Sequence, residues 1–177
     1  MNYDTIKEEI KNIDITLPPP QEEPERQYYF IKKMQNWMEE KKVEKGRELT
    51  CCVNTFGCQM NARDSEKIIG ILMTIGYKVV EDEDADLVIF NTCTVRENAN
   101  LKVYGRLGQL KKYKNKNPEM ITMLCGCMMQ EESVVEKIKK SYRNVDVIFG
   151  THNIFKFAEL LSMKVLDRAD NKKMIID

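Results

Sequence analysis

The chain has 177 residues, of which 42% are hydrophobic and 32% are charged. A chain of this length and composition can bury roughly 70% of its unfolded surface, which excludes intrinsic disorder of the whole chain. Its 28 Lys and Arg residues balance 28 Asp and Glu residues, which excludes a globally basic nucleic-acid binder but leaves room for a local basic patch.

Two features of the sequence set the expected compartment. The longest strongly apolar run, residues 87–90, is far too short to cross a membrane, which takes about 20 residues. The first residues lack the basic stretch and apolar run of a secretory signal. We therefore expect a cytoplasmic protein with no membrane partner. In a reducing compartment, its six cysteines indicate metal, cluster or thiol chemistry rather than a disulfide framework.

Residues 1–46 differ from the rest of the chain and are interpreted as an N-terminal extension. They hold four of the five prolines and no cysteine. The run 18–20 predicts an extended spacer. Residues 27–45 predict a helix, with Phe30, Met34 and Trp37 forming an apolar stripe. We expect this helix to pack on the main domain, with partner binding as the alternative.

From residue 47 onward, short apolar segments alternate with helical patterns. This alternation predicts an α/β fold, with an open, doubly wound, parallel five-stranded sheet of the flavodoxin or Rossmann type. We place this domain at residues 47–165 and interpret residues 166–177 as a linker. The expected strands are residues 49–55, 77–80, 85–91, 120–124 and 145–149, and the expected helices are residues 61–75, 95–113, 131–140 and 154–162.

Three cysteines lie where expected strands end. Cys58, Cys93 and Cys127 follow the first, third and fourth strands, and ligand sites in open α/β sheets form at that edge. Gly57 and Gly126 precede two of them and let the backbone approach a bulky group. Three thiolates at one edge fit a 4Fe–4S cluster that lacks a fourth protein ligand.

Two other interpretations of these cysteines stay open from spacing alone. Structural zinc bound by the three thiols and His152 is one, although structural zinc sites use closely paired ligands. Buried core thiols or redox thiols are the other, because free cysteine is among the most buried residue types. Cys51, Cys52 and Cys125 lie inside expected strands, and we expect them in the core.

The stretches around the three cysteines resemble a known family. Residues 55–61 (TFGCQMN), 91–99 (NTCTVRENA) and 126–130 (GCMMQ) are similar to the three cysteine motifs of the radical-SAM methylthiotransferases. Residues 150–153 (GTHN) match a further family stretch, and the resemblance covers about residues 47–165. The residues of these motifs are most similar to those of the tRNA branch that modifies N6-dimethylallyladenosine beside the anticodon. The branch acting on threonylcarbamoyl-adenosine in tRNA is the alternative.

The resemblance implies a function for the domain. Its three cysteines would hold an auxiliary 4Fe–4S cluster that serves sulfur delivery, while a second cluster in a radical-SAM domain cleaves S-adenosylmethionine. The full-length protein would be a transferase that adds a methylthio group to C2 of the adenine. Its partners would be tRNA and the radical-SAM and RNA-binding domains of the same chain.

The sequence departs from the family at one motif. The radical-SAM triplet Cys-x-x-x-Cys-x-x-Cys is absent, and the chain stops at Asp177. We therefore expect a first domain that is inactive alone and has no catalytic residue of its own. A flavodoxin-like or zinc-binding module without catalysis is the alternative from another class.

Polar and basic residues near the cysteines complete the expected site. Seven bases and one acid occur between residues 96 and 116, which favours either a solvated helix face or a tRNA contact. We expect residues that support the cluster or face the substrate at Gln59, Asn61, Thr94, Arg96 and Gln130.

Overall fold

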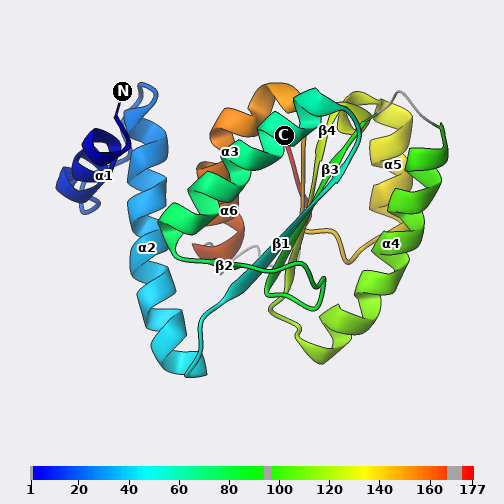
Figure 1. Cartoon of the computed structure of the whole chain (residues 1–177), viewed down its shortest axis with the longest axis horizontal. Coiled ribbons are helices and arrows are strands. Elements are labelled where there is room, and N and C mark those ends of the chain that lie inside the picture. The colour runs from blue at the N-terminus through cyan, green and yellow to red at the C-terminus, as the bar shows by residue number, and fades with distance from the viewer. Residues whose placement is uncertain (1, 94–96, 167–172) are drawn as a thin grey trace.

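The computed structural model describes residues 2–93, 97–166 and 173–177. Within them, six strands pair in parallel in one sheet, in the order β2-β1-β3-β4-β5-β6, with helices on both faces (Figure 1). This arrangement confirms the doubly wound α/β fold expected from the sequence. The strands are β1 (Thr50–Phe56), β2 (Lys78–Val79), β3 (Leu87–Thr92), β4 (Ile121–Gly126), β5 (Val147–Phe149) and β6 (Ile175–Ile176).

Two helical layers enclose the sheet. Helices α3 (Gln59–Ile75) and α6 (Phe157–Leu166) cover one face, and α4 (Glu97–Lys116) and α5 (Glu132–Ser141) cover the other (Figure 1). All six residues of β3 are buried between the two layers, as expected for a central parallel strand. Alternate residues of each strand face opposite layers, so Cys51 joins the α3–α6 core and Cys52 joins the α4–α5 core.

The N-terminal extension packs on the domain. Helix α2 (Glu25–Lys45) lies across α3 and α6, and Met34 and Met38 are fully buried there. Arg26 donates to both carboxylate oxygens of Glu159, at 3.0 Å and 2.6 Å. This contact confirms that the predicted helix packs against the domain. A further helix, α1 (Tyr3–Asn12), precedes the prolines and was not predicted.

Three other features differ from the expected elements. Strand β6 was not predicted, and it lies in the segment interpreted as a linker; its two residues are too few to show periodicity. Two 3-10 helices, η1 (Cys127–Gln130) and η2 (Thr151–Lys156), precede α5 and α6. The closing helix therefore starts at Phe157, three residues later than expected. None of the helices in the described residues is long and apolar enough to span a bilayer.

Candidate functional site

The ends of three adjacent strands bring three cysteines to one edge of the sheet. In the sheet register, Phe56 of β1 pairs with Thr92 of β3, and Thr92 pairs with Gly126 of β4. Cys58 follows two residues after the end of β1, whereas Cys93 and Cys127 follow directly after β3 and β4. The chain reverses direction at the same level in all three strands, so the three thiols occupy neighbouring loops.

The thiol of Cys58 lies at the start of α3. Cys58 is exposed and is the N-cap residue of that helix, and its Sγ is 3.2 Å from Oδ1 of Asn61. The backbone N–H groups of Asn61 and Met60 point at the sulfur and lower the pKa of Cys58, to which the side chain of Cys93 also contributes. A helix N-terminus favours a thiolate in this way, and the thiolate is the form that binds metal.

The other two thiols are less exposed. Cys93 is buried and Cys127 is half-buried. The hydroxyl of Thr151, the first residue of η2, donates to Sγ of Cys127 at 3.6 Å. The solvent exposure of the three cysteines therefore decreases from Cys58 to Cys127 to Cys93.

Two glycines allow the cysteine loops to approach each other. A Cβ on Gly57 would lie 2.6 Å from Cβ of Cys93 and 2.6 Å from Oδ1 of Asn61. Gly126 has a φ of +102°, and a Cβ there would lie 2.1 Å from the carbonyl oxygen of Thr92. No other residue type fits at either position without moving the backbone of a cysteine loop.

A buried hydrogen-bond network fixes the side chain of Asn61. This residue is only 3% exposed, and its Nδ2 donates to Oδ1 of Asn91 and to the carbonyl of Thr92, both at 3.0 Å. In return, Nδ2 of Asn91 donates to the carbonyl of Asn61 at 2.8 Å and to Oγ of Ser65 at 3.0 Å. Because both amide hydrogens are engaged, Oδ1 of Asn61 is turned toward Cys58, whose backbone N–H it accepts at 3.3 Å.

The remaining predicted site residues lie at the edge or outside the described residues. Gln59 is exposed on the first turn of α3, and Gln130 is exposed at the end of η1. Cγ of Gln130 lies 3.3 Å from where a Cβ on Gly150 would be. Thr94 and Arg96 fall on residues that the structure does not describe. The hydrogen bonds between Asn61 and Asn91 were not predicted. The signal for them in the sequence was Asn91, a polar residue in the largely apolar strand β3.

Thiolates are ligands both of zinc and of iron–sulfur clusters, so the geometry of this edge bears on both. Within residues 2–93, 97–166 and 173–177, no three His, Cys, Asp or Glu side chains lie close enough together to bind one ion. His152, the fourth ligand of the zinc alternative, is exposed on η2. Three thiolates are also the protein ligands of a 4Fe–4S cluster that keeps one iron without a protein ligand. Two features fit such a group. Gly57 and Gly126 let the loop backbones come close to it, and the helix N-terminus favours the thiolate of Cys58.

The other three cysteines are core residues, as predicted. Cys51, Cys52 and Cys125 are at most 1% exposed. Burial raises the pKa of Cys51 to about 12 and that of Cys52 to about 11, and it raises the pKa of Cys125 as well. These thiols stay protonated at neutral pH and are poor metal ligands.

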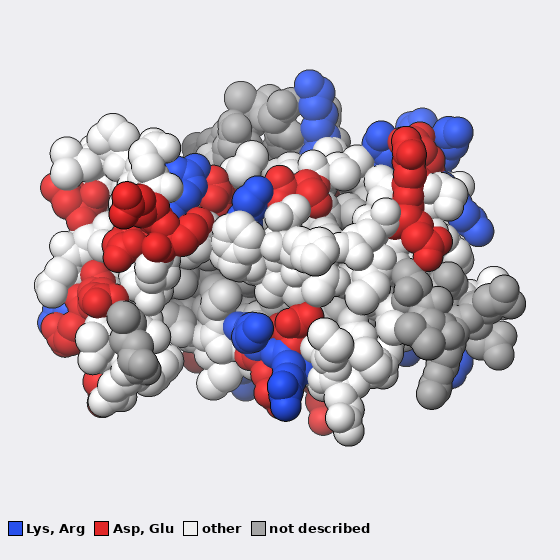
Figure 2. All heavy atoms as spheres, turned by 90° about the horizontal axis from the view of Figure 1, so that it is seen from above, with Lys and Arg blue, Asp and Glu red and all other residues white. Residues whose placement is uncertain are grey.

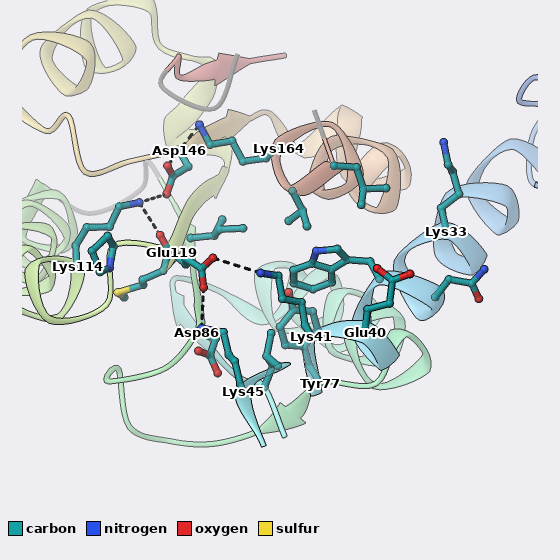
Figure 3. A pocket seen from close by; sticks show the side chains of 18 of the residues that line it. Lys33, Glu40, Lys41, Lys45, Tyr77, Asp86, Lys114, Glu119, Asp146 and Lys164 are labelled. Atoms are coloured by element: carbon teal, nitrogen blue, oxygen red, sulfur yellow. Dashed lines mark hydrogen bonds and ion pairs between the residues drawn. The ribbon is translucent and has the colours of Figure 1, made fainter. Parts of the chain in front are cut away.

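A large cavity lies at the opposite edge of the sheet. It has a volume of about 990 Å³ and lies among the amino ends of the strands and the ends of α2 and α6 (Figure 3). Six of its charged side chains form ion pairs: Glu119 with Lys41 and Lys45, and Asp146 with Lys114 and Lys164. Those pairs brace the helix ends, and the cavity is remote from the cysteines.

Comparison with known proteins agrees with the cysteine motifs. Residues 50–150 match the model described as uncharacterized protein family UPF0004. The chain is 64% identical over 141 residues to the tRNA-2-methylthio-N(6)-dimethylallyladenosine synthase of Lachnoclostridium phytofermentans, a match that covers 78% of this chain and 30% of that protein. A synthase of the same name from Acetivibrio thermocellus is 54% identical over 141 residues, covering 79% of this chain and 29% of the relative.

A third relative matches a larger share of this chain. The synthase of that name from Clostridioides difficile is 46% identical over 168 residues, or 94% of this chain and 34% of the relative. The chain thus spans about a third of the length of these curated relatives. From these matches, the chain belongs to the UPF0004 family and is homologous to the tRNA-2-methylthio-N(6)-dimethylallyladenosine synthases.

Proposed function

We propose that this chain is the domain of a tRNA methylthiotransferase that binds an auxiliary 4Fe–4S cluster. Cys58, Cys93 and Cys127 are its ligands. The observation that carries the proposal is the register of three adjacent strands, because it sets the three thiols in neighbouring loops at one sheet edge. The names of the relatives support the wider activity, which is addition of a methylthio group to C2 of N6-dimethylallyladenosine in tRNA.

The residues around the thiols have different roles in binding the cluster. The N-terminal N–H groups of α3 stabilise the Cys58 thiolate, and the Thr151 hydroxyl donates to Cys127. Asn61 ties the loop of Cys58 to the backbone that precedes Cys93. A cluster with three protein thiolates keeps one iron without a protein ligand, which supplies a binding place for the sulfur to be transferred.

The radical step of the reaction is proposed to use residues outside this chain. Its 177 residues contain no Cys-x-x-x-Cys-x-x-Cys triplet for a second cluster and S-adenosylmethionine. The chain alone, given that cofactor and a reductant, is expected to form no 5′-deoxyadenosine. From a tRNA substrate, we also infer that the protein acts in the cytoplasm.

The test is to measure iron, zinc and acid-labile sulfide per chain after anaerobic reconstitution. Wild type should hold about four irons and four sulfides. Cys58→Ala, Cys93→Ala and Cys127→Ala should each lose most of both. Cys125→Ala is the matched control, because it removes a thiol one residue before Gly126 that faces the core.

Each result decides between the interpretations of the cysteines. Iron and sulfide that depend on the three edge thiols and not on Cys125 support the cluster. Iron that is indifferent to the three substitutions contradicts it. About one zinc per chain, lost in the same variants, replaces the cluster with a zinc site.

A further inference from the structure

Helices α4 and α5 form the outer surface of one side of the molecule, and this surface is strongly basic. Residues 101–143 hold ten bases and four acids, whereas the whole chain holds 28 of each. We define the α4–α5 face by the side chains of both helices and of the two residues that follow α5. Its bases include Lys102, Lys111, Lys112, Lys137, Lys140 and Arg143. We propose that this face binds the phosphate backbone of RNA, and this proposal rests on the proposed function.

A pair of stacked tyrosines makes the two helices one surface. The rings of Tyr104 from α4 and Tyr142, which follows α5, stack with centroids 5.6 Å apart and planes at 17°. The ammonium of Lys137 lies 4.0 Å from the centre of the Tyr104 ring, and that of Lys111 lies 5.5 Å from the centre of the Tyr142 ring. Each lysine of one helix thus reaches the aromatic ring of the other, which fixes two positive charges beside the stack.

The charges on this face divide into two groups. Four bases have carboxylate partners: Arg106 with Glu83, Lys114 with Asp146, Lys116 with Asp84 and Lys139 with Glu136. Within the part of the chain that the structure describes, no ion pair joins the six bases of the α4–α5 face to a carboxylate. Six uncompensated, mostly exposed charges on two adjoining helices repel each other, and a polyanion relieves that repulsion.

Both helices start beside the candidate site. Helix α4 begins at Glu97, shortly after Cys93, and α5 begins at Glu132, shortly after Cys127. With 20 residues, α4 extends about 30 Å away from that edge. An RNA backbone that follows the α4–α5 face would therefore run from the cysteine edge toward the opposite edge, where Arg143 lines the cavity.

The opposite end of the molecule has the opposite character. Looking onto the cysteine edge, Figure 2 shows acidic side chains gathered at the left, where α1 and α2 lie, and Lys and Arg gathered at the upper right, toward α4 and α5, with acidic side chains beside them. Residues 1–46 carry ten acids and eight bases. In a chain without net charge, this difference favours the approach of a polyanion to the α4–α5 face.

The test compares two variants of the full chain that each lose four lysines. The face variant is Lys111→Gln, Lys112→Gln, Lys137→Gln and Lys140→Gln. The control variant is Lys7→Gln, Lys11→Gln, Lys42→Gln and Lys78→Gln, from α1, α2 and β2. The probe is a fluorescent RNA stem-loop with an unmodified adenosine beside the anticodon triplet, and binding is followed by anisotropy over a series of salt concentrations. Circular dichroism confirms that each variant is folded.

Wild type and the control variant should bind the stem-loop with the same salt dependence. The face variant should bind at least about tenfold more weakly, and its slope of log K against log salt should be smaller by about 3, because each lost phosphate contact removes a little under one unit. Equal affinity and slope in the two variants would overturn the proposal, as would a wild type that binds no RNA.

A vesicle arm separates RNA from another anionic partner. Wild type that binds phosphatidylserine vesicles through the same four lysines more tightly than RNA would also overturn the proposal. The iron and sulfide measurement is independent of this assay. A failure of the α4–α5 face therefore leaves the cluster proposal standing, and a failure of the cluster is visible without RNA.

Discussion

The Oδ1 atom of Asn61 lies 3.2 Å from Sγ of Cys58. The same amide donates from Nδ2 to the carbonyl of Thr92, which directly precedes Cys93. One buried side chain thus joins two cysteine loops that come from different strands. Its position makes Asn61 a positioning residue for the thiols.

Replacing Asn61 should damage both stability and cluster binding. Asn61→Ala leaves the buried Asn91 amide without one of its partners, which costs about 1–3 kcal/mol of unfolding free energy. It also frees the loop of Cys58, so reconstituted iron per chain should fall although all three thiols remain. Urea unfolding and iron analysis measure the two effects. The control is Glu66→Ala, which is exposed on the same helix and should change stability by less than about 0.5 kcal/mol. Equal iron content in the two variants would contradict the role given to Asn61.

Gly126 and Gly108 should respond in opposite directions to the same substitution. Gly126→Ala places a methyl group 2.1 Å from the Thr92 carbonyl at a φ of +102°, and we expect a loss of at least about 2 kcal/mol. Gly108→Ala adds a methyl group in open space on α4 and should gain about 0.5–1 kcal/mol, because alanine favours a helix. Thermal unfolding of the two variants checks both signs. A neutral Gly126→Ala would show that the loops of Cys93 and Cys127 are not held as close as described.

The contact between Glu159 and Arg26 should contribute to stability in a pH-dependent way. The Arg26 guanidinium holds the pKa of Glu159 below its ordinary value of 4.5. A lowered folded-state pKa gives stabilisation that is complete above the unfolded-state pKa and is lost as the pH falls through the folded-state pKa. Glu159→Gln should therefore cost about 1–2 kcal/mol at neutral pH.

The measurement for Glu159 is urea unfolding of wild type and Glu159→Gln at neutral pH and again well below pH 4.5. The difference between the two proteins should shrink at the lower pH. A difference that stays the same at both pH values would mean that Glu159 acts through packing of α2 rather than through its charge.

The six thiols of the reduced chain should alkylate in an order set by burial. Cys58 is exposed and should react first with iodoacetamide under native conditions. Cys51, Cys52 and Cys125 are buried with raised pKa values and should react only after urea is added. Peptide mass spectrometry resolves the sites. Fast native labelling of Cys125 would contradict its place in the core.

The strand ends were predictable from sequence because parallel strands share their carboxyl edge. That rule alone brought Cys58, Cys93 and Cys127 to one place without knowledge of the register. The pairing of Asn61 with Asn91 depends on the register of β1 and β3 and on the first turn of α3, and neither is encoded in a local pattern. Strand β6 forms only because Ile175 and Asp177 bond to the β5 region across a long gap in sequence.

The six bases of the α4–α5 face show the same limit. The basic run in α4 was visible in the sequence. Helix α5 is separated from it along the chain by strand β4, so the sequence did not show that the two helices lie side by side. The stacking of Tyr104 on Tyr142, a contact between residues far apart in sequence, helps join the two helices into one surface.

The packing of α2 shows that the unit that folds is longer than the segment matched by the family model. The family match ends at residue 150 and begins at residue 50, yet Met34 and Met38 of α2 share a core with Leu72 of α3 and Leu161 of α6. A protein trimmed to the matched segment would expose the outer side of α3 and half of the sheet to water, and we expect it to aggregate. If that protein failed to take up iron, the cause would be the loss of the helices that cover the core, and the cysteine ligands would still be present. Any assay of the cysteines has to keep the first 46 residues.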